Sequence, residues 1–300
     1  MNLEQLRSML DHQTLLYLGL DVVIAIALLA LMRWAYELWS SIDSDDQLAG
    51  KDNFAYGISI AGSLLALSIV LWSAAERASG DDYLSRAMQM LVYGLVGFVL
   101  IKVGRWAHDR LILNRFNKRD EILKKNISVA LVDAASSLAT ALIIRSVLLW
   151  SEGFNINSGI AIITGFVIAL AVMLVTTRLM ERRFARDNQN DSMQDTLVLG
   201  QLALAVQHGG YLIGTAFAAT AASHMLTYQG QAYITNLLVW LGVGVLFTLL
   251  TVMLSRLTKA FILRGIDCAK EVDHQHNVGV ASIDASLTIG MALILSGLIA

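Results

Sequence analysis

Long apolar segments alternate with short polar connections along this chain. Eight windows of about 20 residues carry few charges, and they lie at approximately 14–36, 54–75, 88–105, 127–149, 158–177, 197–222, 233–255 and 278–299. A helix rises 1.5 Å per residue, so about 20 apolar residues cross the roughly 30 Å hydrocarbon core of a bilayer. The pattern therefore predicts an all-α integral membrane protein with eight transmembrane helices.

A finer pattern recurs about every 75 residues. Each odd-numbered window closes near an arginine, and an amide side chain follows 20 to 23 residues later, just before the next window. The four amides are Asn53, Asn126, Gln201 and Asn277. This spacing predicts four parallel copies of a two-helix hairpin whose second helices start at the amides, although Gln is a poor helix cap. The chain would then divide into two four-helix membrane units, 1–152 and 153–300.

Small residues follow the amides in register. They stand four and eight positions after each amide, as Gly57 and Ala61, Ala130 and Ala134, Ala205 and Gly209, and Ala281 and Ala285. At 100° per residue these positions share one helix face, and small residues there let neighbouring helices approach closely. The seventh position after each amide lies on the same face, and it carries Ile60, Asp133, His208 and Asp284.

Composition agrees with a membrane protein. Of the 300 residues, 56% are hydrophobic and 15% are charged, and the mean hydropathy is +0.60. Soluble domains carry roughly 25% charged residues. The amino-terminal segment lacks the basic region and cleavage site of a signal peptide, so we expect the first window to be a retained span. Cys268 is the only cysteine, which excludes an intramolecular disulfide.

Basic residues set the expected orientation. The connections after the first, third, fifth and seventh windows, together with the adjoining window ends, hold 18 of the 22 lysines and arginines. The positive-inside rule places these connections in the cytoplasm and both termini outside. We therefore expect a multi-pass protein of a bacterial-type plasma (inner) membrane with its termini on the periplasmic side.

The stretch NFAYGISIAGSLLALSIVLWSAA, which starts at Asn53, resembles the even-numbered helices of the YjfL-like family (domain of unknown function 350). Members of that family look like four-helix units in which the amide and small-residue motif occurs twice. Here the resemblance covers essentially the whole chain as two such units in tandem. It implies a fold and a membrane location, but no catalytic residue can be carried over. The acidic and histidine residues at the seventh position depart from the plain family pattern.

Ionisable side chains inside the predicted spans are the main functional candidates. Asp133, His208 and Asp284 lie about two turns, or roughly 10 Å, inside the cytoplasmic boundary. A carboxylate at such a depth costs about 2.5–3.5 kcal/mol on insertion scales, so it is normally inward-facing, partnered or functional. The three could converge as a polar girdle that handles protons, ions or small polar solutes. The structural alternative is interhelical hydrogen bonding, or protonated acids satisfied by Ser137, Ser286 and backbone groups.

A second functional hypothesis is a non-transporting scaffold or stress-response partner protein that acts through cytoplasmic loops 106–126 and 256–277. The expected partners are the lipid bilayer and a second copy or a membrane protein, with no nucleic acid. No P-loop, dinucleotide motif, HExxH or Ser-His-Asp constellation is present, so we expect no enzyme, no catalytic residue and no cofactor. Cys268, His274 and His276 lack a second ligand pair at zinc spacing, which favours a hydrated turn over a metal site.

Overall fold

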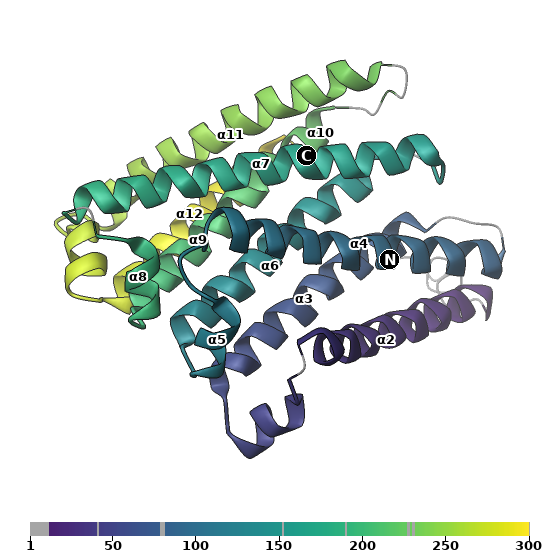
Figure 1. The fold of residues 1–300 in the computed structure, drawn as a ribbon. Helices are drawn as coiled ribbons and strands as arrows, with labels where there is room; N and C mark the ends of the chain where they lie inside the picture. The colour runs from purple at the N-terminus through teal and green to yellow at the C-terminus, as the bar shows by residue number, and fades with distance from the viewer. Residues whose placement is uncertain are drawn as a thin grey trace.

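The computed structural model describes residues 12–40, 42–78, 82–151, 153–189, 191–226, 229 and 232–299. Figure 1 shows a bundle of long helices. They are α2 (His12–Ser40), α3 (Phe54–Arg77), α4 (Tyr83–Leu111), α6 (Ile127–Trp150), α7 (Ile156–Asp187), α9 (Leu202–Thr220), α11 (Tyr233–Ile262) and α12 (Val278–Leu298). Eight spans built on these helices are long and apolar enough to cross a membrane, so the predicted all-α membrane class is confirmed. Residues 1–11 and Ala300, predicted to lie outside, fall beyond the described residues.

Four short helices occupy the connections that precede the even-numbered spans. They are η1 (Asp46–Gly50), α5 (Lys118–Leu123), α8 (Met193–Val198) and η3 (Lys270–His274). A further short helix, α10 (Ala222–Met225), follows α9. The sixth span starts at Leu202 rather than near residue 197, because α8 forms a separate helix before it. All four connections gather at one end of the bundle, which we call the basic end (Figure 1).

The residue directly before each amide has a left-handed backbone. Asp52, Lys125, Gly200 and His276 have φ angles of 47°, 68°, 87° and 56°. This conformation ends the short helix and turns the chain into the next span. Residues with a Cβ atom resist it by about 1–2 kcal/mol, and glycine adopts it readily. Three of the four turns therefore carry a backbone cost that the rest of the structure offsets.

Replacing His276 by glycine is expected to raise the free energy of unfolding by about 1 kcal/mol, because the side chain is exposed and only the backbone preference changes. Gly200→Ala should lower it by a similar amount, since a Cβ atom there meets no neighbour within 4 Å. Equilibrium unfolding of the purified protein in mixed micelles measures both changes. Equal effects of the same sign would contradict the explanation.

The amide side chains join consecutive hairpins. In Asn53, Asn126 and Asn277 the Oδ1 atom accepts a hydrogen bond from the backbone N–H three residues later and caps the helix, whereas Gln201 makes no such bond. The amide nitrogen donates forward to the short helix of the next hairpin. Nδ2 of Asn53 reaches the carbonyl of Ile122 at 3.1 Å, Nδ2 of Asn126 that of Val198 at 2.8 Å, and Nε2 of Gln201 that of Asp273 at 2.9 Å.

The four even-numbered spans form a row in chain order. Helix α3 packs along α6, α6 along α9, and α9 along α12, while no comparable contact joins α12 to α3 within the described residues (Figure 1). Each odd-numbered helix after the first lies in the groove between its own even helix and the preceding one, as α4 does against α6 and α3. The row is therefore open, and α3 and α12 are its ends. That the four hairpins are copies of one unit remains a prediction.

Candidate functional site

Asp133 lies in a sealed cluster of charges between α3, α4 and α6. Its carboxylate is fully buried and accepts hydrogen bonds from Arg105 Nη2 at 2.9 and 3.0 Å. Lys118 Nζ, at the start of α5, lies 2.6 Å from Oδ1 of Asp133 and 2.7 Å from Oδ1 of Asp109. Ser59 donates its hydroxyl to Oδ2. Two cations and two carboxylates therefore neutralise one another, which is the arrangement that a buried charge requires.

Asp284 lies in the corresponding place between α9, α11 and α12. It is 1% exposed, and Gln207 Nε2 donates to Oδ2 at 2.7 Å. Lys259 Nζ forms an ion pair with Oδ1 and also donates to the hydroxyl of Tyr211 at 3.0 Å. Tyr211 in turn donates to Oδ2 of Asp284 at 3.2 Å. A single lysine thus compensates this carboxylate, with two neutral donors in support.

The cluster around Asp284 differs from the one around Asp133 at two positions, which are compared by their distance from Asn277 and Asn126. Arg105 and Arg256 each stand 21 residues before their amide, but Arg256 makes no ion pair or hydrogen bond among the described residues. Lys118 stands eight residues before its amide, and the equivalent residue is Ala269. Around Asp284, therefore, no lysine stands at the position of Lys118, and the arginine at the position of Arg105 forms no ion pair with the carboxylate.

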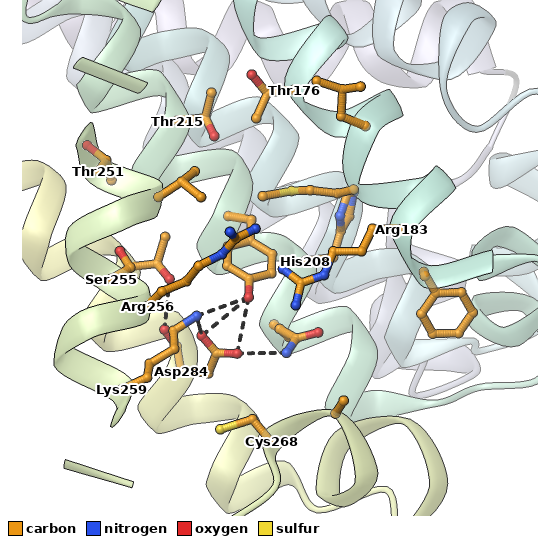
Figure 2. Close-up of a pocket in the computed structure, with 18 of the residues that line it drawn as sticks. Thr176, Arg183, His208, Thr215, Thr251, Ser255, Arg256, Lys259, Cys268 and Asp284 are labelled. Carbon is orange, nitrogen blue, oxygen red and sulfur yellow. Dashed lines mark hydrogen bonds and ion pairs between the residues drawn. The ribbon is translucent and has the colours of Figure 1, made fainter. Parts of the chain in front are cut away.

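A cavity of about 360 Å³ lies beside Asp284, and both Arg256 and Ala269 line it. It lies between α7, α9, α11 and α12 and reaches the basic end, where the exposed Asp187 and the connection after α11 line it. Figure 2 shows Arg256, Lys259 and Asp284 on one side of it, Arg183 and His208 on the other, and three threonines at its far end. Pockets of this size accommodate small organic ligands.

Three buried polar side chains that line this cavity have no hydrogen-bond partner within the part of the chain that the structure describes. They are His208 through Nε2, Thr251 through Oγ1 and Ser255 through Oγ, and each is 2–3% exposed. Nearly all buried polar groups in folded proteins are hydrogen-bonded, so a group of such atoms around one cavity requires an explanation. Together with Arg256, these side chains present unused hydrogen-bonding capacity to a single space.

Acidic groups at the mouth of the cavity are already engaged. Asp187 Oδ1 accepts from Arg186 and Oδ2 from Arg183. Asn188 donates to Asp273 Oδ2 at 3.0 Å, and burial raises the pKa of Asp273. Burial likewise raises the pKa of the Cys268 thiol, so this cysteine lines the cavity as a neutral group. Arg183 and Lys259 pair with carboxylates, so Arg256 is the cation of the lining that has no ion pair or hydrogen bond within the described residues.

The three predicted intramembrane residues do not meet at one point. His208 and Asp284 line the same cavity, whereas Asp133 lies in the cluster between α3, α4 and α6. The ring of His208 also faces that of His108 on α4, with centroids 6.3 Å apart. The expected convergence as a girdle fails because, in an open row, equal positions fall at successive interfaces. Ser137 donates to the backbone carbonyl of Asp133 and Ser286 is exposed, so neither satisfies a carboxylate as the structural alternative expected.

One known protein family matches both halves of the chain. The family described as Domain of Unknown Function (DUF350) matches residues 9–148 and again residues 151–299. The chain belongs to the DUF350 family. A relative, the UPF0719 transmembrane protein of Aquifex aeolicus (strain VF5), is 25% identical over 163 residues, which are 53% of this chain and 58% of the relative. The chain thus spans little more than half the length of that relative, and no solved structure matches it.

Most of the groups that surround the two carboxylates in this DUF350 protein were not singled out from the sequence. Lys118, Lys259 and Tyr211 look like ordinary residues of a basic connection or of a span end. None of the three residue types recurs at the same distance from the other amides, so the repeat does not mark them. Arg105 and Arg256 were recognised as equivalent, but nothing in the sequence separates the paired arginine from the unpaired one.

Proposed function

We propose that this multi-pass membrane protein binds a small organic anion in the cavity of its second unit. The finding that carries the proposal is the group of partnerless buried side chains His208, Thr251 and Ser255, which line the same cavity as the unpaired Arg256. The first unit, where Arg105 and Lys118 close around Asp133, serves as the structural counterpart.

Charge selects the class of ligand. Each acid around the cavity already accepts hydrogen bonds, whereas the guanidinium of Arg256 has five N–H donors and no acceptor among the described residues. Guanidinium groups bind carboxylates and phosphates in a two-point geometry. A carboxylate or phosphate ester would therefore place its anionic group at Arg256.

The remainder of the cavity selects the body of the ligand. Met180, Leu204 and Val252 supply apolar wall, while the hydroxyls of Thr251 and Ser255 offer hydrogen bonds. Most small-molecule pockets combine an apolar wall with a few polar groups in this way. By the positive-inside rule the basic end, and with it the mouth of the cavity, would face the cytoplasm. The ligand would then enter from the cytoplasmic side.

Benzoate and phenyl phosphate are suitable probes, with benzylamine as the cationic counterpart. We expect the two anions to raise the unfolding temperature of the purified full chain, because a ligand at 100 times its Kd stabilises the folded state by about 2.7 kcal/mol. Benzylamine should have no effect. Arg256→Gln should weaken binding of the anions roughly tenfold to a hundredfold, since a hydrogen bond to a charged group contributes about 1.5–3 kcal/mol.

Arg264→Gln is the matched control, because Arg264 is an exposed arginine just beyond the end of α11, the helix that carries Arg256, and does not line the cavity. It should bind both anions as the parent does. Absence of stabilisation by either anion, or equal binding by the parent and Arg256→Gln, would overturn the proposal. Either result would favour the scaffold that acts through loops 106–126 and 256–277.

A further inference from the structure

The three interfaces of the helix row are built from the same positions. Each pairs the ninth residue after one amide with the eighth residue after the next amide: Gly62 with Ala134, Ala135 with Gly209, and Gly210 with Ala285. A Cβ atom on Gly62 or Gly210 would lie 2.5 Å from the Cα atom of its partner, so these helices cross in very close contact. One surface motif therefore joins consecutive hairpins three times.

Each even-numbered helix carries two contact surfaces, or halves of the motif: one faces the next hairpin along the row and the other faces the preceding hairpin. The half that faces the next hairpin includes the ninth residue, which is buried in the first three hairpins but exposed as Ser286 in the fourth. The half that faces the preceding hairpin includes the fourth residue. That residue is 0% exposed as Ala130, Ala205 and Ala281, but half-buried as Gly57. The ends of the row thus carry the two unpaired halves.

Polar groups at the basic end follow the same rule. The first three amides donate to a carbonyl of the next hairpin's short helix, while Nδ2 of Asn277 donates to Glu271 of its own hairpin at 2.8 Å. Asn53 and Asn126 donate to carbonyls four or three residues before the next amide. The same positions before Asn53 are Ala49 and Gly50, whose carbonyls would accept from Asn277 of a neighbouring copy. Both residues are exposed at the other end of the row.

Helix α2 also lacks the neighbour that its counterparts have. Each later odd-numbered helix packs on the even helix of the preceding hairpin, as α4 does on α3, but α2 packs on no such helix within the described residues. Its side chains Val23 and Ile26 are 64% and 62% exposed. The surface formed by α2, η1 and α3 is therefore ready to receive a helix with the pattern of α12.

We propose that a second copy of this chain supplies that helix, with α12 of one copy packed against α2 and α3 of the next. The contact continues the row with the register of its three internal interfaces. Ser286 would lie against Ala61, and Asn277 would donate to the short helix η1 of the neighbouring copy. Both copies keep the same sense in the membrane, because the hairpins within one chain already do. Such a head-to-tail contact closes into a ring or extends as a chain of copies.

Cysteine crosslinking in membranes tests this contact. In a Cys268→Ser background, the double variant Ala61→Cys, Ser286→Cys should give a crosslinked dimer and larger species with a short thiol-reactive crosslinker. Each single variant should give almost none, because two copies of the same half do not meet. Ala61→Cys combined with Met253→Cys is the control, since Met253 is 57% exposed on α11 and outside the contact.

Absence of crosslinking in the double variant, with both cysteines still labelled by a maleimide, would overturn the proposal. Efficient crosslinking of either single variant would also overturn it, because it would indicate a symmetric contact. As an independent measurement, native mass spectrometry of Ser286→Trp should show single copies, while Met253→Trp should retain the oligomer. Neither result depends on whether the cavity between α7 and α11 binds an anion, so the two proposals fail separately.

Discussion

Asp133→Ala is expected to lower the free energy of unfolding by about 3–5 kcal/mol, because it leaves Arg105 and Lys118 buried without their shared carboxylate. The side chains of both cations are only 10% exposed, so water compensates them poorly. Asp284→Ala should cost less, since its partner Lys259 borders the cavity and loses a single ion pair. Equilibrium unfolding of the purified protein in mixed micelles measures the difference.

The double variant Asp133→Ala, Arg105→Met provides the control. Arg105 loses its ion pair in Asp133→Ala, whereas Lys118 keeps the one with Asp109, so removing Arg105 should recover part of the lost stability and the two changes should not add. Additive effects, or an Asp133→Ala cost below about 1 kcal/mol, would contradict a compensated charge cluster. The same reasoning means that loss of a transport or binding signal in an Asp133 variant does not by itself assign function to Asp133.

Gly62→Ala and Gly210→Ala are each expected to destabilise the protein by about 1–3 kcal/mol or more, which is the usual cost of overpacking. The added methyl group would overlap backbone atoms of Ala134 or Ala285, and backbone cannot rotate away as a flexible side chain can. The helices of each pair would have to separate along their length. The measurement is again equilibrium unfolding.

Gly290→Ala is the matched control in α12. A Cβ atom at Gly290 meets nothing within 4 Å, so the substitution adds no overlap and gains helix propensity. It should stabilise the protein by about 0.5–1 kcal/mol. A destabilising Gly290→Ala, or a neutral Gly62→Ala, would show that close helix crossing is not what these glycines provide.

Much of this fold could be read from the sequence because its determinants are local. The length of each span follows from the thickness of a bilayer, and the helical period places residues four, seven and eight positions after an amide on one face. Asp133, His208 and Asp284 are accordingly buried, as are Ala130, Ala205 and Ala281. The repeated amides and small residues also pointed to the family that matches the chain twice.

Only the tertiary structure decided how the helices are ordered and which groups meet. Equal positions in four hairpins fit a closed ring as well as an open row, and the row separates Asp133 from the cavity that His208 and Asp284 line. The pairing of Asp133 with Lys118 depends on how the short helix α5 folds back over the basic end, and that of Asp284 with Lys259 depends on how α11 packs against α12. The cavity depends on Ala269 at the position of Lys118 and on an arginine left without a partner. Periodicity determines the face on which a side chain lies, but its partner depends on the crossing of helices that are distant in the chain.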